Sequence, residues 1–354
     1  MLIQGQPHSA FIVCADISAE AYAWDFIAAL PEKPIHIQAI GGDYLKKKGV
    51  VIWKNNHHLS VIGFLQCLIK LPRILLTFIQ TIRHIKKSKP SMLILVDAGA
   101  FNMRLIRATC GLNIPTYYMM PPRLSLSGMP QHSNITFIHY YDFEKDKLAE
   151  LNAHQVRHPK VDLIVPQSPP QLPIKQLAFF PGSRYSELKH HIPVLEALRH
   201  AINMHVTYYI QQPHNQQLAE KLGVPKHIIS HLPPQDVAAD FAICSSGTIT
   251  LELALRGIPM ICIYRLRRID FLLIKQLVKV QHIALPNLIL DEKLVPELIQ
   301  DDCSVETIAK KMHSLTQMDL QNQIKGFAMI RENLSRSHSL EQLLAKKSAM
   351  VHES

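Results

Sequence analysis

Short apolar runs of strand length alternate with longer helical patterns from one end of the chain to the other. The runs cover residues 11–14, 35–40, 92–96, 116–119, 136–139, 177–180, 206–210, 241–244 and 260–264. Strands that are apolar throughout and separated by helices are typical of parallel sheets buried on both faces. The pattern therefore predicts an α/β fold built from doubly wound, Rossmann-like sheets.

The length of 354 residues suits two domains, since one domain commonly takes about 150 residues. The strongest proline cluster, residues 165–173, is predicted to be an extended linker, because proline cannot donate to a strand ladder and restricts its predecessor. We expect one domain over residues 1–168, a second over 169–325, and a helical segment over 326–354. Ligands of doubly wound sheets bind at the carboxyl ends of the strands, so residues just after the strands are the functional candidates.

The chain carries 38 Lys and Arg against 28 Asp and Glu, a formal net charge of +10. Such an excess indicates an anionic partner: a nucleic acid, a phosphorylated metabolite or an acidic lipid surface. Aromatic residues make up only 7%, which disfavours a protein that stacks single-stranded bases. Nucleic-acid binding also explains none of the loops described below, so no nucleic-acid partner is expected.

Six scattered cysteines lack zinc spacing and are expected to be buried, reduced thiols of a cytosolic protein. Adjacent histidines such as His190 and His191 cannot converge on one ion, so most of the 20 His are expected at the surface, and neither a metal nor a cofactor is expected.

The N-terminus lacks a secretion signal, and no run of 18 apolar residues exists. These features predict a cytoplasmic protein without a membrane span.

Residues 181–184, Pro-Gly-Ser-Arg, directly follow the predicted strand 177–180 and precede a helical pattern. Glycine lets a backbone approach an oxyanion, serine supplies a hydroxyl, and Arg184 offers a two-pronged guanidinium. The loop is therefore a candidate phosphate site. The alternative is an ordinary turn in which Ser183 caps the next helix.

A second loop of this kind follows the predicted strand 241–244 and reads Ser-Ser-Gly-Thr over residues 245–248. Ser246, Gly247 and Thr248 would place N–H groups and hydroxyls at a helix N-terminus, where the helix dipole favours phosphate. Glu252, one helical turn beyond Thr248, is suited to accept hydrogen bonds from vicinal hydroxyls such as those of a ribose. The alternative is a capped helix with a solvated glutamate. The loop lacks both the lysine of a Walker loop and the spacing of a dinucleotide site.

In order and spacing, these loops resemble those of bacterial lipid A disaccharide synthases, membrane-associated glycosyltransferases with two Rossmann-like domains in the GT-B arrangement. The resemblance runs nearly end to end and is densest over residues 180–187, 245–252 and 257–265. It continues through 277–279, 285–288 and 295–300. The resemblance implies the GT-B fold, with two domains facing a cleft.

The resemblance implies an enzyme that transfers 2,3-diacylglucosamine from UDP-2,3-diacylglucosamine to 2,3-diacylglucosamine 1-phosphate, releasing UDP, with inversion and without a metal. It assigns the donor diphosphate to Arg184, Ser246, Gly247 and Thr248, and the ribose to Glu252. It assigns the rest of the nucleotide and sugar pocket to Asn287, Glu297 and Gln300. Without a metal, the leaving-group charge must fall on arginine, hydroxyl and N–H groups, which these loops contain.

Residues 96–102, Val-Asp-Ala-Gly-Ala-Phe-Asn, match the segment in which the family carries its essential aspartate and a Phe-Asn pair. An aspartate at the end of a buried strand is suited to take a proton from an acceptor hydroxyl. The resemblance therefore implies Asp97 as the general base, Asp16 as a helper, and Asn102 and His158 in substrate binding. The alternative is that Asp97 only caps the following helix.

The family's first loop, Gly-Glu-x-Ser-Gly-Asp, is Ala-Asp-Ile-Ser-Ala-Glu at residues 15–20, and a second family aspartate is Ala100 here. Ala15 and Ala19 in place of glycine block a close backbone approach and disfavour positive φ. The acceptor side is therefore altered while the donor side is intact. Two alternatives follow: a UDP-sugar glycosyltransferase with another acceptor, and a non-catalytic paralogue that binds UDP-sugar or lipid.

Residues 59–85 and 266–275 are apolar with interspersed Lys and Arg. Such helices can lie in a lipid interface with their basic side chains at anionic head groups, although most amphipathic helices simply pack on a sheet. With the acylated substrates that the resemblance implies, they favour peripheral association with the inner membrane. The family resemblance also implies a homodimer, and C-terminal helices that return to the N-terminal domain.

Overall fold

The computed structural model describes residues 9–14, 17–56, 64–121, 132–268, 271 and 281–352. The chain divides into two compact units, one formed by Met1–His158 with Arg336–Ser354 and the other by Pro159–Ser335. It therefore passes between the units at 158/159 and at 335/336, where the sequence suggested 168/169 and 325/326. The proline-rich segment lies along the second unit, because the Gln167 N–H donates to the Arg256 carbonyl oxygen over 2.8 Å.

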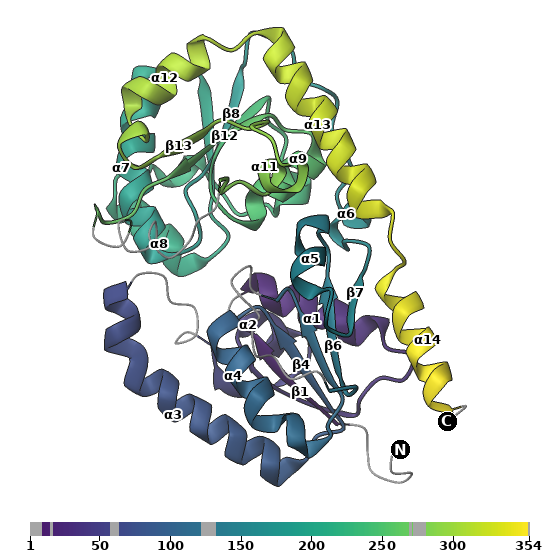
Figure 1. The fold of residues 1–354 in the computed structure, drawn as a ribbon. Coiled ribbons are helices and arrows are strands. Elements are labelled where there is room, and N and C mark those ends of the chain that lie inside the picture. The colour runs from purple at the N-terminus through teal and green to yellow at the C-terminus, as the bar shows by residue number, and fades with distance from the viewer. Residues whose placement is uncertain are drawn as a thin grey trace. The chain divides into compact units, whose positions relative to one another are not determined.

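In the first unit the described residues form a seven-stranded parallel sheet in the order β3-β2-β1-β4-β5-β6-β7 (Figure 1). The strands are β1 (Ser9–Cys14), β2 (His36–Gly41), β3 (Val51–Asn55), β4 (Met92–Val96), β5 (Thr116–Met119), β6 (Ile135–His139) and β7 (Ala153–Gln155). The helices are α1 (Ile17–Ala29), α2 (Asp43–Lys47), α3 (Phe64–Ser88), α4 (Gly99–Thr109), α5 (Lys145–Leu148) and α14 (Leu340–His352). Although α14 ends the chain, it belongs to this unit, where Lys347 Nζ donates to Thr136 Oγ1 over 3.1 Å.

In the second unit the described residues form a six-stranded parallel sheet in the order β10-β9-β8-β11-β12-β13. The strands are β8 (Gln176–Phe180), β9 (His205–Tyr209), β10 (Ile229–Ser230), β11 (Phe241–Ser245), β12 (Met260–Tyr264) and β13 (Glu297–Ile299). The helices are α6 (Lys160–Leu163), α7 (Tyr185–Ala201), α8 (Pro213–Lys221), α9 (Thr248–Arg256), α11 (Leu285–Leu290), α12 (Val305–His313) and α13 (Gln317–Ser335). Every apolar run predicted to be a strand lies in one of these two sheets.

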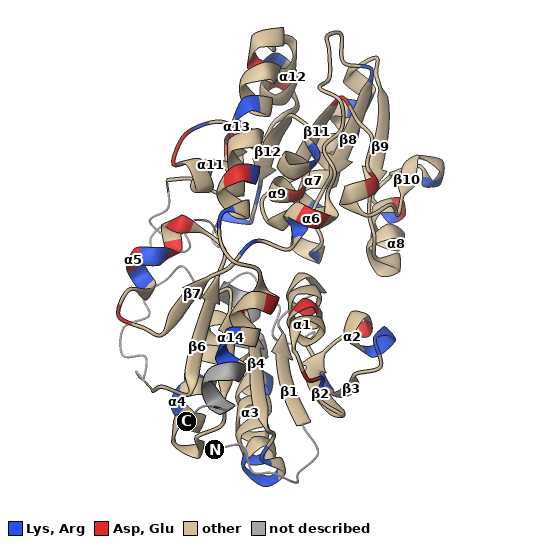
Figure 2. Cartoon of the chain, turned by 90° about the vertical axis from the view of Figure 1, so that its right-hand side faces the viewer, with Lys and Arg blue, Asp and Glu red and all other residues tan. Residues whose placement is uncertain are grey.

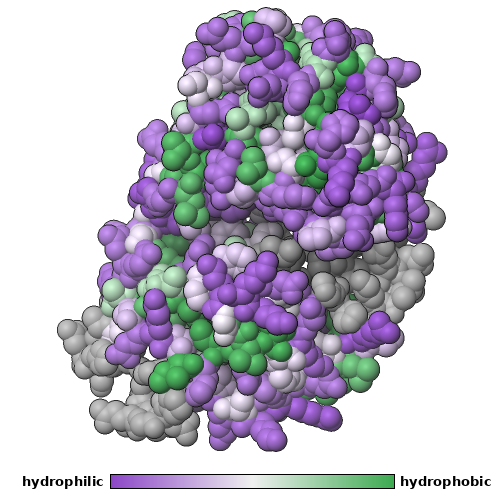
Figure 3. Space-filling view, turned by 180° about the vertical axis from the view of Figure 1, so that it is seen from behind, coloured by the Kyte–Doolittle hydropathy of each residue, from purple (hydrophilic) through white to green (hydrophobic). Residues whose placement is uncertain are grey.

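Charged residues of both signs are spread over the helices and loops of each unit (Figure 2). On the face drawn in Figure 3, hydrophilic side chains predominate, and the hydrophobic ones form separate patches. Four of the five cysteines whose side chains are described, Cys14, Cys244, Cys262 and Cys303, are buried, and none of the five forms a disulfide. The four buried side chains agree with the expectation of buried cysteines, and Cys110 is partly exposed.

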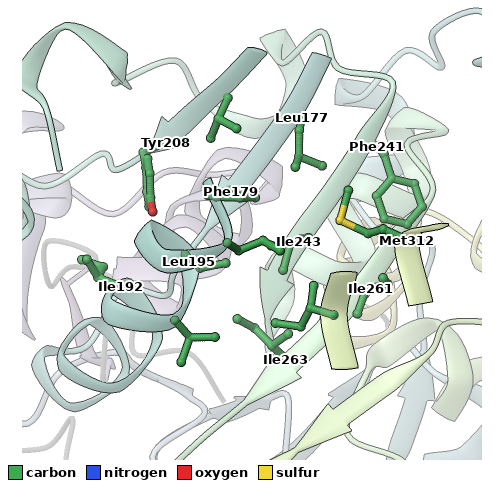
Figure 4. Packing of buried hydrophobic residues seen from close by; sticks show 14 of the residues in the cluster. Leu177, Phe179, Ile192, Leu195, Tyr208, Phe241, Ile243, Ile261, Ile263 and Met312 are labelled. Carbon is green, nitrogen blue, oxygen red and sulfur yellow. The ribbon is translucent and has the colours of Figure 1, made fainter. Parts of the chain in front are cut away.

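Both sheets are buried on both faces, which is the physical reason for their apolar strands. In the first unit, Phe11 and Val13 pack with Ile85 of α3 and Leu105 of α4, while the alternate residue Ile12 is buried on the other face. In the second unit, residues of the four strands β8, β9, β11 and β12 pack against α7 and α12 in one apolar cluster (Figure 4). The loops 181–184 and 245–248 and the residue Asp97 lie at the C-terminal ends of strands and so at the carboxyl edges of these sheets.

Candidate functional site

In each sheet the strand order reverses between two central strands, and this is where open α/β sheets bind ligands. The reversal lies between β1 and β4 in the first unit and between β8 and β11 in the second. In the second unit Cys244 is in register with Phe180 on the neighbouring strand. The loops 181–184 and 245–248 therefore leave the sheet from neighbouring strands, side by side.

The loop 181–184 is organised by Glu187, whose side chain is almost fully buried. Glu187 Oε2 accepts hydrogen bonds from the N–H groups of Ser183 (3.1 Å) and Arg184 (3.4 Å), and Oε1 accepts one from Arg184 Nη1 (3.0 Å). Gly182 has a φ of +111°, which favours glycine. The alternative in which Ser183 caps α7 is wrong, because the N-cap residue is Arg184 and the acceptor is the Glu187 carboxylate.

The loop 245–248 leads into α9 through Gly247, whose φ is +133°. Gly247 is the N-cap residue of α9 and provides no side-chain cap, so the first turn of the helix is open to an anion from outside. The Ser246 hydroxyl donates to the Ile283 carbonyl oxygen over 2.8 Å. Backbone N–H groups and Thr248 are therefore better placed than the Ser246 hydroxyl to bind a phosphate.

Asn287 and Glu297 hold the segment that receives Ser246. Glu297 Oε1 accepts hydrogen bonds from the N–H groups of Ile283 (3.0 Å) and Ala284 (2.8 Å) and from Asn287 Nδ2 (2.9 Å). Asn287 is fully buried, and its Oδ1 also accepts from the Val295 N–H over 2.7 Å. Both residues thus position the loop around Ser246 in the described structure.

The loop after β12 is held by His191 and Gln300. Arg265 N–H donates to His191 Nε2 (3.0 Å), so Nδ1 carries the proton and donates to the Pro181 carbonyl oxygen (2.7 Å). Gln300 Oε1 accepts from the Leu266 N–H over 2.7 Å. His191 is an exception to the expectation that most histidines lie at the surface: it is fully buried and links the 181–184 loop to the segment after β12.

Acid should weaken this link through His191. Burial, the largest cause, lowers the pKa of His191 below its usual value near 6.5. The neutral ring therefore contributes stability above about pH 6.5 that is lost as the pH falls through the lowered pKa. We expect the difference in Tm between the wild type and His191→Gln, which does not titrate, to shrink between pH 7.5 and pH 5. A difference that stays constant over this range would contradict the assignment.

In the first unit, Asp97 directly follows β4 at the point where the strand order reverses. Its side chain is exposed, and its carbonyl oxygen accepts hydrogen bonds from Asn102 Nδ2 (2.8 Å) and the Tyr118 hydroxyl (3.1 Å). The N-cap residue of α4 is Ala98, so Asp97 does not occupy the capping position. Asn102 is fully buried and fixes the backbone of Asp97.

Asp97 and Ala98 have φ values of +51° and +48°, in the left-handed region. Each non-glycine residue there costs roughly 1 kcal/mol, and such strain gathers at functional sites. We expect Ala98→Gly to raise the Tm of the first unit by roughly 1 to 4 °C, because glycine removes the strain at a smaller entropic cost. Ala108→Gly, inside α4, is the matched control and should lower the Tm. If both substitutions lower it equally, Ala98 is not strained.

His158 is fully buried, and its Nε2 lies 3.0 Å from the Tyr22 hydroxyl oxygen. Its ring also packs against Tyr140, with ring centroids 4.8 Å apart. These contacts place His158 in the interior of the first unit, immediately before the chain passes to the second. Asp16, the expected helper of Asp97, lies outside the described residues.

Glu252 is only 9% exposed and forms an ion pair with Lys160 of α6. The alternative of a solvated glutamate is therefore wrong. Lys160 could not be predicted as the partner of Glu252, because the two residues are far apart in the chain and only the fold brings them together.

Most of the residues that the resemblance assigns to the sugar-nucleotide donor thus lie near the carboxyl edge of the second sheet. Among the described residues, no group of three or more His, Cys, Asp and Glu could hold a metal ion. A pocket of about 480 Å³ lies elsewhere in this unit, where β13 begins, and includes Leu294, Pro296 and Gly326 in its lining. None of the predicted site residues lines that pocket.

Comparison with known proteins identifies one family over most of the chain. Residues 10–125 and 135–352 match the family model described as lipid-A-disaccharide synthetase. The lipid-A-disaccharide synthase of Bradyrhizobium diazoefficiens is 27% identical over 345 residues, covering 88% of this chain and 87% of that protein. Lipid-A-disaccharide synthase 1 of Legionella pneumophila is 27% identical over 366 residues, covering 93% and 94%.

Solved structures with the same architecture are distant in sequence. MurG of Acinetobacter baumannii superposes with a TM-score of 0.54 at 12% identity, covering 96% of this chain and 98% of that one. The spinosyn rhamnosyltransferase SpnG, complexed with thymidine diphosphate, gives a TM-score of 0.56 at 11% identity, covering 96% and 100%. With these neighbours, the two doubly wound sheets are those of the GT-B glycosyltransferase fold.

Proposed function

The chain belongs to the lipid-A-disaccharide synthetase family, and we propose that it transfers 2,3-diacylglucosamine from UDP-2,3-diacylglucosamine to 2,3-diacylglucosamine 1-phosphate, releasing UDP. Family membership makes it a glycosyltransferase of lipid A biosynthesis. One observation carries the choice of donor: two phosphate-suited loops leave neighbouring strands at the reversal point of the second sheet.

The donor diphosphate is held by groups on these two loops. The Arg184 guanidinium, the N–H groups at the start of α9 and the Thr248 hydroxyl share its charge, and Glu252 accepts hydrogen bonds from the ribose. Asn287, Glu297 and Gln300 act by holding the surrounding loops, which is supported by their hydrogen bonds to backbone groups. As UDP leaves, these groups balance the growing negative charge, so the reaction needs no metal.

The acceptor hydroxyl is activated by Asp97. The Asp97 carboxylate takes the hydroxyl proton while the hydroxyl oxygen attacks the anomeric carbon, and the bond to the UDP oxygen breaks. Attack from the face opposite the leaving group inverts the anomeric centre. The strained backbone and the exposed side chain at the reversal point of the first sheet support this role. Asp16 assists Asp97 in the proposal.

The experiment is product analysis after incubating the purified protein with both acylated sugars in detergent and EDTA. We expect a disaccharide 1-phosphate by mass spectrometry, with an anomeric proton coupling that shows inversion. A product formed only after a divalent metal is added would contradict the metal-free reaction. Retention of configuration would contradict the single displacement.

The altered residues at positions 15, 19 and 100 favour one rival, a UDP-sugar glycosyltransferase with another acceptor. In that case the protein would bind UDP and form no product with 2,3-diacylglucosamine 1-phosphate. Screening hydroxylated lipid acceptors with the same donor then separates this rival from a paralogue that only binds. Replacing Ala15 and Ala19 with glycine should restore turnover if these two alanines are what prevents the acceptor from binding.

The proposed reaction takes place at the inner membrane surface, where the protein associates peripherally. None of the described helices is long and apolar enough to cross a membrane. On α3, Ile74, Phe78 and Ile82 pack against the core, while a second apolar row faces outward. That row, the α3 outer row, consists of Leu71 (52% exposed), Leu75 (56%), Leu76 (59%) and Ile79 (40%). Arg73 and Arg83 lie on the same helix, within reach of anionic head groups.

Replacing Leu75 and Leu76 with aspartate should lower binding to anionic phospholipid vesicles at least tenfold, because each leucine contributes about 1.5 to 3 kcal/mol when buried in lipid. Binding of the wild type should also weaken as salt rises, since salt screens the basic residues. Cosedimentation measures both effects. Leu232→Asp, at another exposed leucine, is the control. Equal binding by all three proteins would rule out the α3 outer row as the membrane surface.

A further inference from the structure

The short helix α6 is fixed beside α9 by the guanidinium of Arg331 on α13. Arg331 donates to the carbonyl oxygens of Val161 and Ile164 at the end of α6 and of Leu255 on α9, each over 2.6 Å. Three charge-assisted hydrogen bonds to two helices leave α6 little freedom to move relative to α9. Lys160, the first residue of α6, is therefore held at a defined place beside α9.

Lys160 uses this place to reach Glu252 on α9. The two side chains form an ion pair and are only 19% and 12% exposed. A shielded carboxylate beside a cation stays ionised and keeps one orientation, whereas a shielded carboxylate alone is costly. Because a carboxylate has about four acceptor positions, Glu252 retains capacity for further hydrogen bonds.

We propose that Lys160 is a positioning residue that holds the Glu252 carboxylate toward the two ribose hydroxyls of the donor nucleotide and so makes the site select ribonucleotides over 2′-deoxyribonucleotides. The inference rests on the proposed function, because it needs Glu252 to face the ribose. Glu252 lies one helical turn from Thr248 at the proposed diphosphate site, so a ribose attached to that diphosphate is within its reach. Lys160 acts only through Glu252 and does not itself contact the nucleotide.

A merely structural ion pair would behave differently. If the pair only docks α6 on α9, losing it lowers the Tm and weakens all nucleotides equally. If Lys160 orients the carboxylate, losing it weakens the binding of UDP more than the binding of 2′-deoxy-UDP, since the deoxynucleotide already lacks one of the two hydroxyls that Glu252 would bind. The ratio of the two dissociation constants therefore separates positioning from docking.

The experiment is calorimetric titration of the full-length protein with UDP and with 2′-deoxy-UDP. We expect the wild type to prefer UDP by roughly ten- to a hundredfold, the range for a hydrogen bond to a charged group. Lys160→Met, which keeps the apolar stem and removes the charge, should bring the ratio close to one. Lys160→Arg should retain most of the preference, because the cation remains. Lys145→Met, which breaks an exposed pair with Asp142, is the control and should leave the ratio unchanged.

A preference that survives in Lys160→Met would overturn the inference while leaving the proposed donor intact. A wild type that binds UDP and 2′-deoxy-UDP equally would also overturn it. A wild type that binds neither nucleotide would overturn the proposed donor itself, and the inference with it. If Lys160→Met does not fold, Lys160→Gln and Lys160→Arg provide the same comparison.

Discussion

Asp97→Asn should lower kcat by about 10²- to 10⁴-fold, the range supplied by a general base, while the dissociation constant for UDP stays the same. Asparagine keeps the shape of the side chain and tolerates the positive φ at this position. It cannot take a proton from the acceptor. Steady-state kinetics with both acylated sugars, together with calorimetric titration of UDP, measure the two quantities.

Asp146→Asn is the matched control, because Asp146 is an exposed aspartate of the same unit on α5. It should leave both kcat and UDP affinity unchanged. Full turnover by Asp97→Asn would show that another group takes the proton. Loss of UDP affinity together with turnover would mean that Asp97 supports the fold or the donor instead.

Gly182→Ala should weaken UDP binding by roughly tenfold or more and also lower the Tm. The added β-carbon would clash with the Glu187 carboxylate, which holds the 181–184 loop. A β-carbon at residue 182 would lie 2.3 Å from Glu187 Oε2, and the φ of +111° disfavours any side chain there. Glu187 must then move and give up its hydrogen bonds to Ser183 and Arg184. Calorimetric titration with UDP and thermal unfolding measure the two effects.

Gly223→Ala separates the clash from the backbone strain. Gly223 has a φ of +101°, but a β-carbon there would meet no atom within 4 Å. It should cost only the conformational strain, about 1 to 3 kcal/mol, and leave UDP affinity unchanged. If the two substitutions have the same effect on UDP affinity, the 181–184 loop does not hold the donor.

Burial explains which strands can be predicted from the sequence and which cannot. Every central strand of both sheets was predicted from its apolar run, because both faces of those strands are covered. The strands that the sequence analysis missed are β3, β7, β10 and β13, which are the four edge strands. These edge strands have two to five residues and are half exposed. Their sequences therefore lack the continuous apolar run that distinguishes a buried strand from a loop. Edge strands carry little hydrophobic signal and take their place from the neighbouring strand.

For the candidate site, too, the sequence predicts the positions of residues better than their contacts. The position of residues after a strand predicted where Arg184, Thr248 and Asp97 lie, because carboxyl edges of parallel strands share one side of the sheet. The partners of such residues depend on contacts far apart in sequence, as with Lys160 and Glu252. His191 carried a signal that was missed: it lies three residues after the buried Leu188, on the apolar face of α7.

The hydrogen-bond partners of Asn287, Glu297 and Gln300 also could not be predicted from the sequence. The resemblance implies a place in the nucleotide and sugar pocket for these residues, and the structure adds hydrogen bonds from them to backbone groups of the neighbouring loops. Polar side chains are equally suited to a ligand and to a backbone N–H group, and only geometry distinguishes the two.

Release of UDP from UDP-2,3-diacylglucosamine, measured with and without 2,3-diacylglucosamine 1-phosphate in detergent and EDTA, tests whether the protein carries out the proposed transfer. We expect release of UDP that depends on the acceptor, persists in EDTA and is lost in Asp97→Asn. Measurable UDP binding without acceptor-dependent release would contradict the proposed transfer and leave a donor-binding protein whose acceptor half serves another purpose.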